Sequence, residues 1–310
     1  LYVLDVDRAE ANLGRLERAF PEARIHYAVK ANADGTLLSR FATAGIGAEC
    51  ASAGEVRRAL DAGFDQSDVL YTPVNPPARD LDAVVEWWEP GAGLTVTAGA
   101  TDTIERLAAR GYDGRVAIRV HPGVGAGHGD DVATGADAKF GIPVEAVGSA
   151  AGTAQERGLS VVGLHAHTGS GIMEEDVDAH RRVVETLARL AREMDTTLEY
   201  IDVGGGFGVP YRPEESPLDL GLLADSTSDA LAGGGVSHIQ RIGMDPVSDL
   251  RMGLADRPQG LLPAGTDHHL PVIPGESDRQ RLTNPGAGPG NQGDPSALRR
   301  RACHAALCPR

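Results

Sequence analysis

The sequence of 310 residues is poor in lysine and in long apolar runs. Only two of its 29 basic residues are lysines, Lys30 and Lys139, and the formal net charge is −15. Such an acidic surface repels nucleic acid and anionic membranes, so we expect neither as a partner. No apolar run approaches the roughly 20 residues that a membrane helix needs, and no signal peptide opens the chain. We therefore expect a cytoplasmic protein.

Cysteine is also scarce, and the chain does not start with methionine. Cys50, Cys303 and Cys308 form neither a zinc-binding cluster nor a disulfide framework, which fits a reducing compartment. We expect no metal site. The chain starts at Leu1 in a stretch that is typical of a strand, and we expect the natural N-terminus to lie further upstream.

Aromatic residues are missing from the last third of the chain. All 13 lie at or before Tyr211, and a folded enzyme domain of about a hundred residues without one would be unusual. Residues 1–220 carry 35 acidic and 20 basic side chains, whereas residues 221–310 carry nine of each. We therefore predict a folded domain over residues 1–220 and an irregular tail over residues 221–310. The tail is either a flexible extension or, as we favour, the product of a frameshift or a mispredicted gene.

Up to residue 211, short β-branched runs alternate with amphipathic helical patterns. We predict seven strands, at residues 24–30, 47–51, 69–72, 94–97, 115–121, 160–167 and 198–203. Ser52 with Glu55 forms a capping box that predicts a helix start, and Asp102 with Glu105 repeats it. This α/β alternation fits a parallel (β/α)8 barrel or an open doubly wound sheet, and periodicity alone does not separate the two.

Polar residues follow two of the predicted strands. Lys30 ends an apolar strand, where a neutral amine could form a Schiff base with an aldehyde; a solvated lysine is the alternative. His165 and His167 lie on the same face of another strand, shortly before Ser170. The two histidines could bind zinc, although no third ligand is evident beside them. Alternatively, an imidazole could stack on a flat cofactor ring while Ser170 reaches a phosphate, or His165 is simply a core histidine.

A third segment, Gly204, Gly205 and Gly206, directly follows a predicted strand. Three glycines allow backbone N–H groups to surround an anion without interference from a Cβ atom, although a tight turn would also need them. The segment matches neither the dinucleotide-binding nor the Walker pattern, which argues against a Rossmann or P-loop role.

In their order along the chain, these segments resemble the alanine-racemase-like family of barrels that bind pyridoxal 5'-phosphate (PLP). Within that family they are similar to the decarboxylases of diaminopimelate, ornithine and arginine. The resemblance implies these roles: PLP carried by Lys30, ring stacking by His167, and phosphate contacts by Ser170, Gly204, Gly205 and Gly206. Glu49 aligns with a position where the family normally carries aspartate, so it is a further expected cofactor-binding residue.

The narrower resemblance, to diaminopimelate decarboxylases, rests on residues 119–124, where His121 replaces the usual asparagine, and on residues 139–143. His128 and Thr134 lie between the two segments in the expected order. After residue 211, however, two family segments are missing. One is Glu-Pro-Gly-Arg, whose glutamate meets the pyridine nitrogen, and the other is the Cys-Glu-rich segment that enters the partner subunit's active site.

The resemblance implies an incomplete PLP-binding (β/α)8 barrel of about seven βα units. It also implies PLP-dependent decarboxylation of meso-diaminopimelate to L-lysine and CO2, in lysine biosynthesis. The alternatives are a decarboxylase of the ornithine or arginine type, or a non-catalytic PLP-binding remnant. The partners implied are a small diamino acid substrate and a second copy of the chain, as a homodimer.

Overall fold

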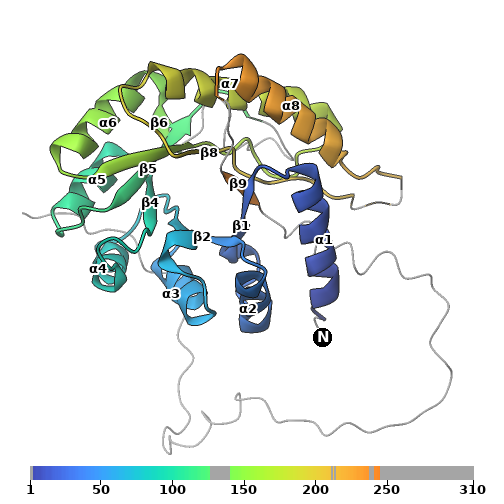
Figure 1. Cartoon of the computed structure of the whole chain (residues 1–310), viewed down its shortest axis with the longest axis horizontal. Helices are drawn as coiled ribbons and strands as arrows, with labels where there is room; N and C mark the ends of the chain where they lie inside the picture. The colour runs from blue at the N-terminus through green and yellow to red at the C-terminus, as the bar shows by residue number, and fades with distance from the viewer. Residues whose placement is uncertain (1–2, 126–139, 211, 213, 237–240, 245–310) are drawn as a thin grey trace, which may run out of the picture. The chain divides into compact units, whose positions relative to one another are not determined.

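The structure, a computed structural model, describes residues 3–125, 140–210, 212, 214–236 and 241–244, all within one compact unit. Its centre is a ring of parallel strands (Figure 1). The strands of the ring are β1 (Arg24–Ala28), β2 (Gly47–Cys50), β3 (Val69–Tyr71), β4 (Thr95–Ala98), β5 (Arg115–His121), β7 (Ser160–His165), β8 (Tyr200–Asp202) and β9 (Arg241–Met244). Each strand pairs with the next, β9 pairs back to β1, and the short β6 (Ile142–Pro143) is added to β5. The predicted α/β barrel class is confirmed.

Each of the seven strands expected from the sequence is present, with ends that differ by at most a few residues. The strand over Arg115–His121 has the predicted bounds, whereas β1 ends at Ala28 rather than at Lys30. The difference at β1 has a local cause, because Val29–Ala31 turns into a 3₁₀ helix, η1, directly after the strand.

Strand β9 occupies the position for which the sequence analysis identified no strand. It pairs with β1 from Arg24↔Arg241 to Tyr27↔Met244, and with β8 at Asp202↔Arg241. Both β9 and helix α8 (Leu220–Gly233) extend the barrel past the predicted boundary at residue 220. The rest of the predicted tail, residues 245–310, lies outside the described residues.

The helices lie on the outer side of the strands (Figure 1). They are α1 (Val6–Ala19), α2 (Gly35–Thr43), α3 (Ala53–Asp61), α4 (Ala78–Trp87), α5 (Thr101–Ala108), α6 (Val147–Glu156), α7 (Val177–Glu193) and α8. Short 3₁₀ helices η2 (Gln66–Asp68), η3 (Val144–Ala146) and η4 (Glu174–Asp176) supplement them. The longest, α7, buries the apolar stripe expected from its 3.6-residue period, including Val183, Val184 and Leu187. Among the described helices, none is both long enough and apolar enough to cross a bilayer.

The N-cap of the first predicted capping box is present. Ser52 is the N-cap of α3, and its hydroxyl accepts from the backbone N–H of Glu55 over 3.3 Å, while the Glu55 carboxylate accepts from the N–H of Ala51 over 2.8 Å and not from that of Ser52. The prediction at Asp102 is wrong. Helix α5 begins two residues earlier, with Ala100 as N-cap, so Asp102 falls inside the first turn and pairs with Arg106 at 3.5 Å.

Inside the ring, four buried side chains pack together as a small apolar layer. The apolar layer joins side chains from strands on opposite sides of the barrel: Leu70, Ala117, Val162 and Tyr200. Bulky rings are accommodated by glycines on neighbouring strands, since a Cβ atom at Gly47 would overlap the imidazole of His26.

Candidate active site

Lys30 lies just beyond the carboxyl end of β1. It is in the η1 turn and is exposed, while its neighbour Val29 is fully buried and anchors the turn. The phenol of Tyr27 donates to the carbonyl of Asn32 over 2.9 Å, which closes the loop that carries Lys30. Active sites of parallel α/β barrels form at this end of the strands. The Tyr-Ala-Val-Lys-Ala-Asn segment therefore presents an amine at the mouth of the barrel.

The loops after β7 and β8 lie side by side. The N–H of Ile172 donates to the carbonyl of Gly206 over 2.9 Å, and the N–H of Gly208 donates back to Ile172 over 2.7 Å. These bonds form a parallel bridge between Ile172 and Phe207. The structure thus joins the His-Thr-Gly-Ser-Gly segment to the glycine loop, two motifs that are far apart in the sequence.

The glycine loop needs glycine for two reasons. Gly204 and Gly206 have φ angles of 75° and 88°, a left-handed conformation that other residues rarely adopt. A Cβ atom at Gly204 would also lie 2.6 Å from the carbonyl oxygen of Ala166, and one at Gly206 would overlap the carbonyl oxygen of Gly169. The glycines therefore allow the two loops to approach each other, with Gly205 buried between them.

Below these loops, His165 and Asp202 form a buried pair. Nδ1 of His165 lies 3.0 Å from Oδ2 of Asp202, and the side chains are 4% and 1% exposed. The other carboxylate oxygen of Asp202 accepts from the N–H of Gly204 over 2.9 Å. Of the interpretations open for His165, the structure therefore favours a buried core histidine that lies beside a carboxylate. No group of three His, Cys, Asp or Glu side chains in the described ranges could hold a metal ion.

His167 and Glu49 are coupled electrostatically to Lys30. Burial, and then the positive charge of Lys30, lowers the pKa of His167 to about 3, so its imidazole is neutral at physiological pH. Burial raises the pKa of Glu49, and the charge of Lys30 opposes this effect. Both side chains therefore lie within electrostatic range of Lys30.

Arg119 on β5 adds a second cation to this end of the barrel. Burial lowers its pKa, whereas the negative charges of Glu49 and Asp202 act in the opposite direction. Its guanidinium lies 5.5 Å from the centre of the Phe140 ring, which belongs to the Lys-Phe-Gly-Ile segment. Two of the segments that carried the narrower resemblance therefore meet at the barrel mouth.

The loop that carries His167 and Ser170 is attached to α7. Oγ1 of Thr168 lies 3.0 Å from Nδ1 of His180, and both residues are buried. Ser170 is exposed near the tip of the same loop. The contact with α7 holds the base of the loop in place and leaves the serine hydroxyl accessible.

The structure thus brings Lys30, Glu49, His167 and the glycine loop to one end of the barrel, with Ser170 on the adjoining loop. Lys139, His128 and Thr134 lie outside the described residues. Asp202, Arg119 and His180 were not expected to have site roles. For Asp202 the sequence contained a local indication of a structural role, because Asp-x-Gly is a common turn pattern. For His180 the sequence contained no such indication, since the residue lies within the apolar stripe of a helix.

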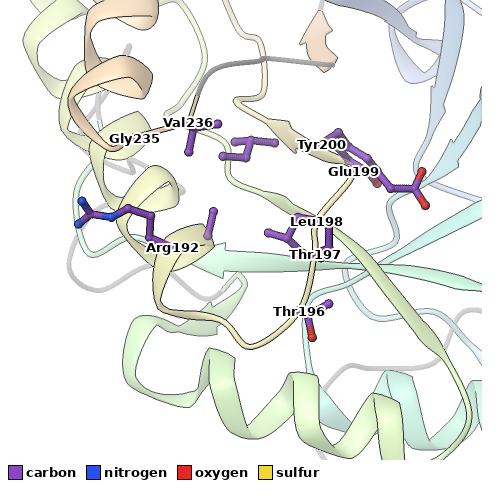
Figure 2. Close-up of a pocket in the computed structure, with 10 residues that line it drawn as sticks. Arg192, Thr196, Thr197, Leu198, Glu199, Tyr200, Gly235 and Val236 are labelled. Atoms are coloured by element: carbon purple, nitrogen blue, oxygen red, sulfur yellow. The ribbon is translucent and has the colours of Figure 1, made fainter.

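A pocket of about 340 Å³ occurs away from these residues, beside the amino end of β8 (Figure 2). Its walls include Thr196, Leu198 and Val236. The charged ends of Arg192 and Glu199 point away from each other in Figure 2, and the carboxylate of Glu199 binds Arg115 at 2.7 and 2.6 Å. Because the motif residues lie at the carboxyl ends of the strands, this pocket is not the candidate active site.

Comparison with known proteins agrees with the geometry of the barrel mouth. Residues 6–240 match the model of the family described as "Pyridoxal-dependent decarboxylase, pyridoxal binding domain". The chain belongs to this family. The matched segment includes α8, and it therefore continues past the predicted domain boundary at residue 220.

Among members of the pyridoxal-dependent decarboxylase family, the chain is 36% identical to diaminopimelate decarboxylase of Methanothermobacter thermautotrophicus, over 74% of this chain and 56% of that protein. A mutant of the Helicobacter pylori diaminopimelate decarboxylase, complexed with L-lysine, matches with a TM-score of 0.70 at 25% identity, over 77% of this chain and 62% of that one. A crystal structure of the protein SrLDC in complex with PLP and cadaverine matches with a TM-score of 0.66 at 26% identity, over 79% of this chain and 60% of that one. The chain thus spans little more than half the length of the first of these relatives.

Proposed function

We propose that the barrel binds PLP at the carboxyl ends of its strands, with Lys30 as the covalent attachment point. The observation that carries this proposal is the pair of hydrogen bonds between Ile172 and the glycine loop. It unites a serine-bearing loop and a glycine loop on the side of the barrel where Lys30 lies. The aldehyde of PLP must reach a lysine amine while its phosphate reaches a group of N–H and hydroxyl donors. Lys30 and the two joined loops lie on the same side of the barrel, so this arrangement supports the binding of both groups at once.

The residues present fit the phosphate of PLP. Because Gly204 and Gly206 have no Cβ atom, the glycine loop can lie against the loop that carries Ser170, so that backbone N–H groups and a hydroxyl come to the same end of the barrel, where they could bind an anion. Ser170 offers an accessible hydroxyl on the adjoining loop. The cations Lys30 and Arg119 favour a dianion at this end of a chain that is otherwise acidic.

The residues also fit the aromatic ring of PLP. The neutral imidazole of His167 is suited to stacking on a flat ring, because it requires no counter-ion there. We propose that Glu49 faces the cofactor as well, in place of the aspartate of the resembling family. Its carboxylate lies close enough to Lys30 for the lysine charge to act on it.

We propose that the whole protein decarboxylates meso-diaminopimelate to L-lysine and CO2, as a step of lysine biosynthesis. Bound PLP supplies the electron sink for the carbanion that remains when the carboxylate leaves. The chain's own residues hold the phosphate, face the ring and keep the amine of Lys30 in position. The similarity to diaminopimelate decarboxylases and the L-lysine in the Helicobacter pylori structure support this substrate. A decarboxylase of the ornithine or arginine type, which shares the Lys-Phe-Gly segment, is the alternative within the class.

A second candidate is a PLP-binding chain without decarboxylase activity. The 310 residues contain no Glu-Pro-Gly-Arg segment, which in the resembling family supplies the acid at the pyridine nitrogen, so this candidate applies to these 310 residues by themselves. For the intact protein we propose a cytoplasmic homodimer, since the active site of the resembling family takes residues from two subunits. Reading the gene in all frames for Glu-Pro-Gly-Arg would separate the two candidates.

The proposal of PLP binding is tested by comparing the two lysines of the chain. We expect PLP to give the visible absorbance band of a lysine-linked imine with the purified chain, and Lys30→Ala to abolish it. Lys139→Ala is the matched control and should retain the band. Borohydride reduction followed by peptide mass analysis should place the cofactor on Lys30. A reducible adduct that persists in Lys30→Ala would contradict the assignment.

A further inference from the structure

Asp202 connects the two halves of the candidate phosphate cradle. Its Oδ1 accepts from the N–H of Gly204 over 2.9 Å, and its Oδ2 lies 3.0 Å from Nδ1 of His165. Its backbone carbonyl accepts from the N–H of Ala166 over 3.0 Å. One residue at the end of β8 thus binds both its own following loop and the end of the neighbouring strand β7.

The carboxylate of Asp202 is almost completely shielded from water, at 1% exposure. Burial would raise its pKa, but the charge and hydrogen bond of His165 and the N–H of Gly204 together lower it to about 2. Asp202 is therefore ionised in the folded protein at neutral pH. A buried carboxylate is tolerated only where its oxygens are satisfied, so its partners are held in a defined geometry.

The hydrogen bond to Asp202 also determines which N–H groups of the glycine loop can face an anion. Gly204 directs its N–H inward to Oδ1 of Asp202, at a φ of 75°. Gly206 is held in place by its carbonyl, which accepts from Ile172. This leaves the N–H groups of Gly205 and Gly206 as the donors of the loop that a phosphate would meet, whereas Gly204 serves the turn.

We propose that Asp202 is a positioning residue that fixes the glycine loop for phosphate recognition, so that it controls the preference for PLP over unphosphorylated pyridoxal. The inference rests on the proposed binding of PLP at Lys30. Asp202 would not touch the cofactor itself. It acts through Gly204, whose fixed orientation aligns the next two N–H groups, and through His165, which stops the carboxylate from rotating.

The chain contains a matched control for this arrangement. Asp219 also precedes a glycine by two residues, and its Oδ1 accepts from the N–H groups of Gly221 and Leu222 over 2.8 and 3.2 Å. It is the exposed N-cap of α8. Asp219→Ala therefore removes the same kind of Asp-to-glycine hydrogen bond without changing the candidate phosphate cradle.

The experiment measures dissociation constants of PLP and of pyridoxal by absorbance titration of the 310-residue chain and its variants. We expect Asp202→Ala to weaken PLP binding on the order of 10- to 100-fold and pyridoxal binding by less than about threefold. Asp202→Asn keeps an oxygen for Gly204 but loses the charge, so we expect a loss of about three- to tenfold that is specific to PLP. Asp219→Ala should leave both constants unchanged. Thermal unfolding without ligand checks that each variant is folded.

An unchanged ratio of the two constants in Asp202→Ala would overturn the inference, whether both ligands were weakened equally or neither. If Asp202→Ala does not fold, the test passes to Asp202→Asn: an unchanged ratio of the PLP and pyridoxal dissociation constants in that variant would overturn the inference as well. Failure of the proposed function gives a different result. In that case the wild-type chain shows no Lys30-dependent absorbance band with either ligand, and both proposals fall together.

Discussion

The aromatic ring of Tyr200 on β8 lies against the backbone of Gly163 on the neighbouring strand β7. A Cβ atom at Gly163 would come within 2.6 Å of two ring carbons. Gly163 and Tyr200 are also register partners in the sheet. The glycine is thus required by a ring that belongs to the apolar layer inside the barrel.

We expect Gly163→Ala to destabilise the chain by about 1–3 kcal/mol, because the added methyl group overfills a packed layer. In a Tyr200→Leu background the same substitution should cost at least about 1 kcal/mol less, which a double-mutant cycle of urea unfolding would measure. Gly148→Ala in α6, where a Cβ atom meets nothing within 4 Å, is the control and should be neutral or stabilising. Strict additivity of Gly163→Ala and Tyr200→Leu would show that the ring does not impose the glycine.

Gly206→Ala should disrupt the junction between the loops after β7 and β8. The substitution strains a left-handed residue and drives a methyl group into the carbonyl oxygen of Gly169. We expect a loss of stability of several kcal/mol and a weaker affinity for PLP. Gly111→Ala, at a φ of 81° with nothing within 4 Å, isolates the backbone strain and should cost only about 1 kcal/mol. Equal melting temperatures for the two variants would argue against the close approach of the loops.

The lowered pKa of His180 predicts that the folded chain loses stability in mild acid. Burial lowers its pKa to about 4 in the folded chain, whereas the unfolded value is about 6.5. Between these values the unfolded state binds the additional proton, so the stabilising contribution is complete above pH 6.5 and declines as the pH falls toward 4. From pH 7 to pH 5 we expect this residue to cost the wild-type chain about 2 kcal/mol.

His180→Asn keeps a polar group for Thr168 but cannot titrate. Urea unfolding at pH 7 and pH 5 should therefore show a smaller loss in His180→Asn than in the wild-type chain. His167, whose pKa is lowered to about 3, contributes in the same direction in both proteins and cancels in the comparison. Identical losses would mean that burial does not hold His180 in its neutral form.

For activity, we expect the 310-residue chain to release CO2 from meso-diaminopimelate poorly. It lacks the Glu-Pro-Gly-Arg segment, and loss of one electrostatic contact to a reacting group typically costs on the order of 10²–10³ in rate. The assay compares the purified chain with a version in which another reading frame is restored after residue 220. Full activity of the unmodified chain would show that its last ninety residues supply the missing groups in another form.

The positions of the motif residues could be predicted from the sequence because they obey local rules. Apolar runs with β-branched residues predicted the strands, and in a parallel sheet the residues that come directly after each strand lie at the same end. Lys30, His167 and Gly204–Gly206 were expected at that end for this reason. Strand β9 was not expected, because its four residues include a glycine and its pairing with β1 joins parts of the chain that are far apart in the sequence.

The sequence by itself therefore determined the α/β alternation, the confirmed resemblance to PLP barrels and the order of the polar segments along the chain. Only the tertiary structure decided which polar groups meet. Asp202 contacts His165 because β7 and β8 are neighbours in register, and Thr168 contacts His180 because α7 packs on β7. Such contacts depend on long-range pairing and on the exclusion of water from the interior, and no local pattern of residue types specifies either one.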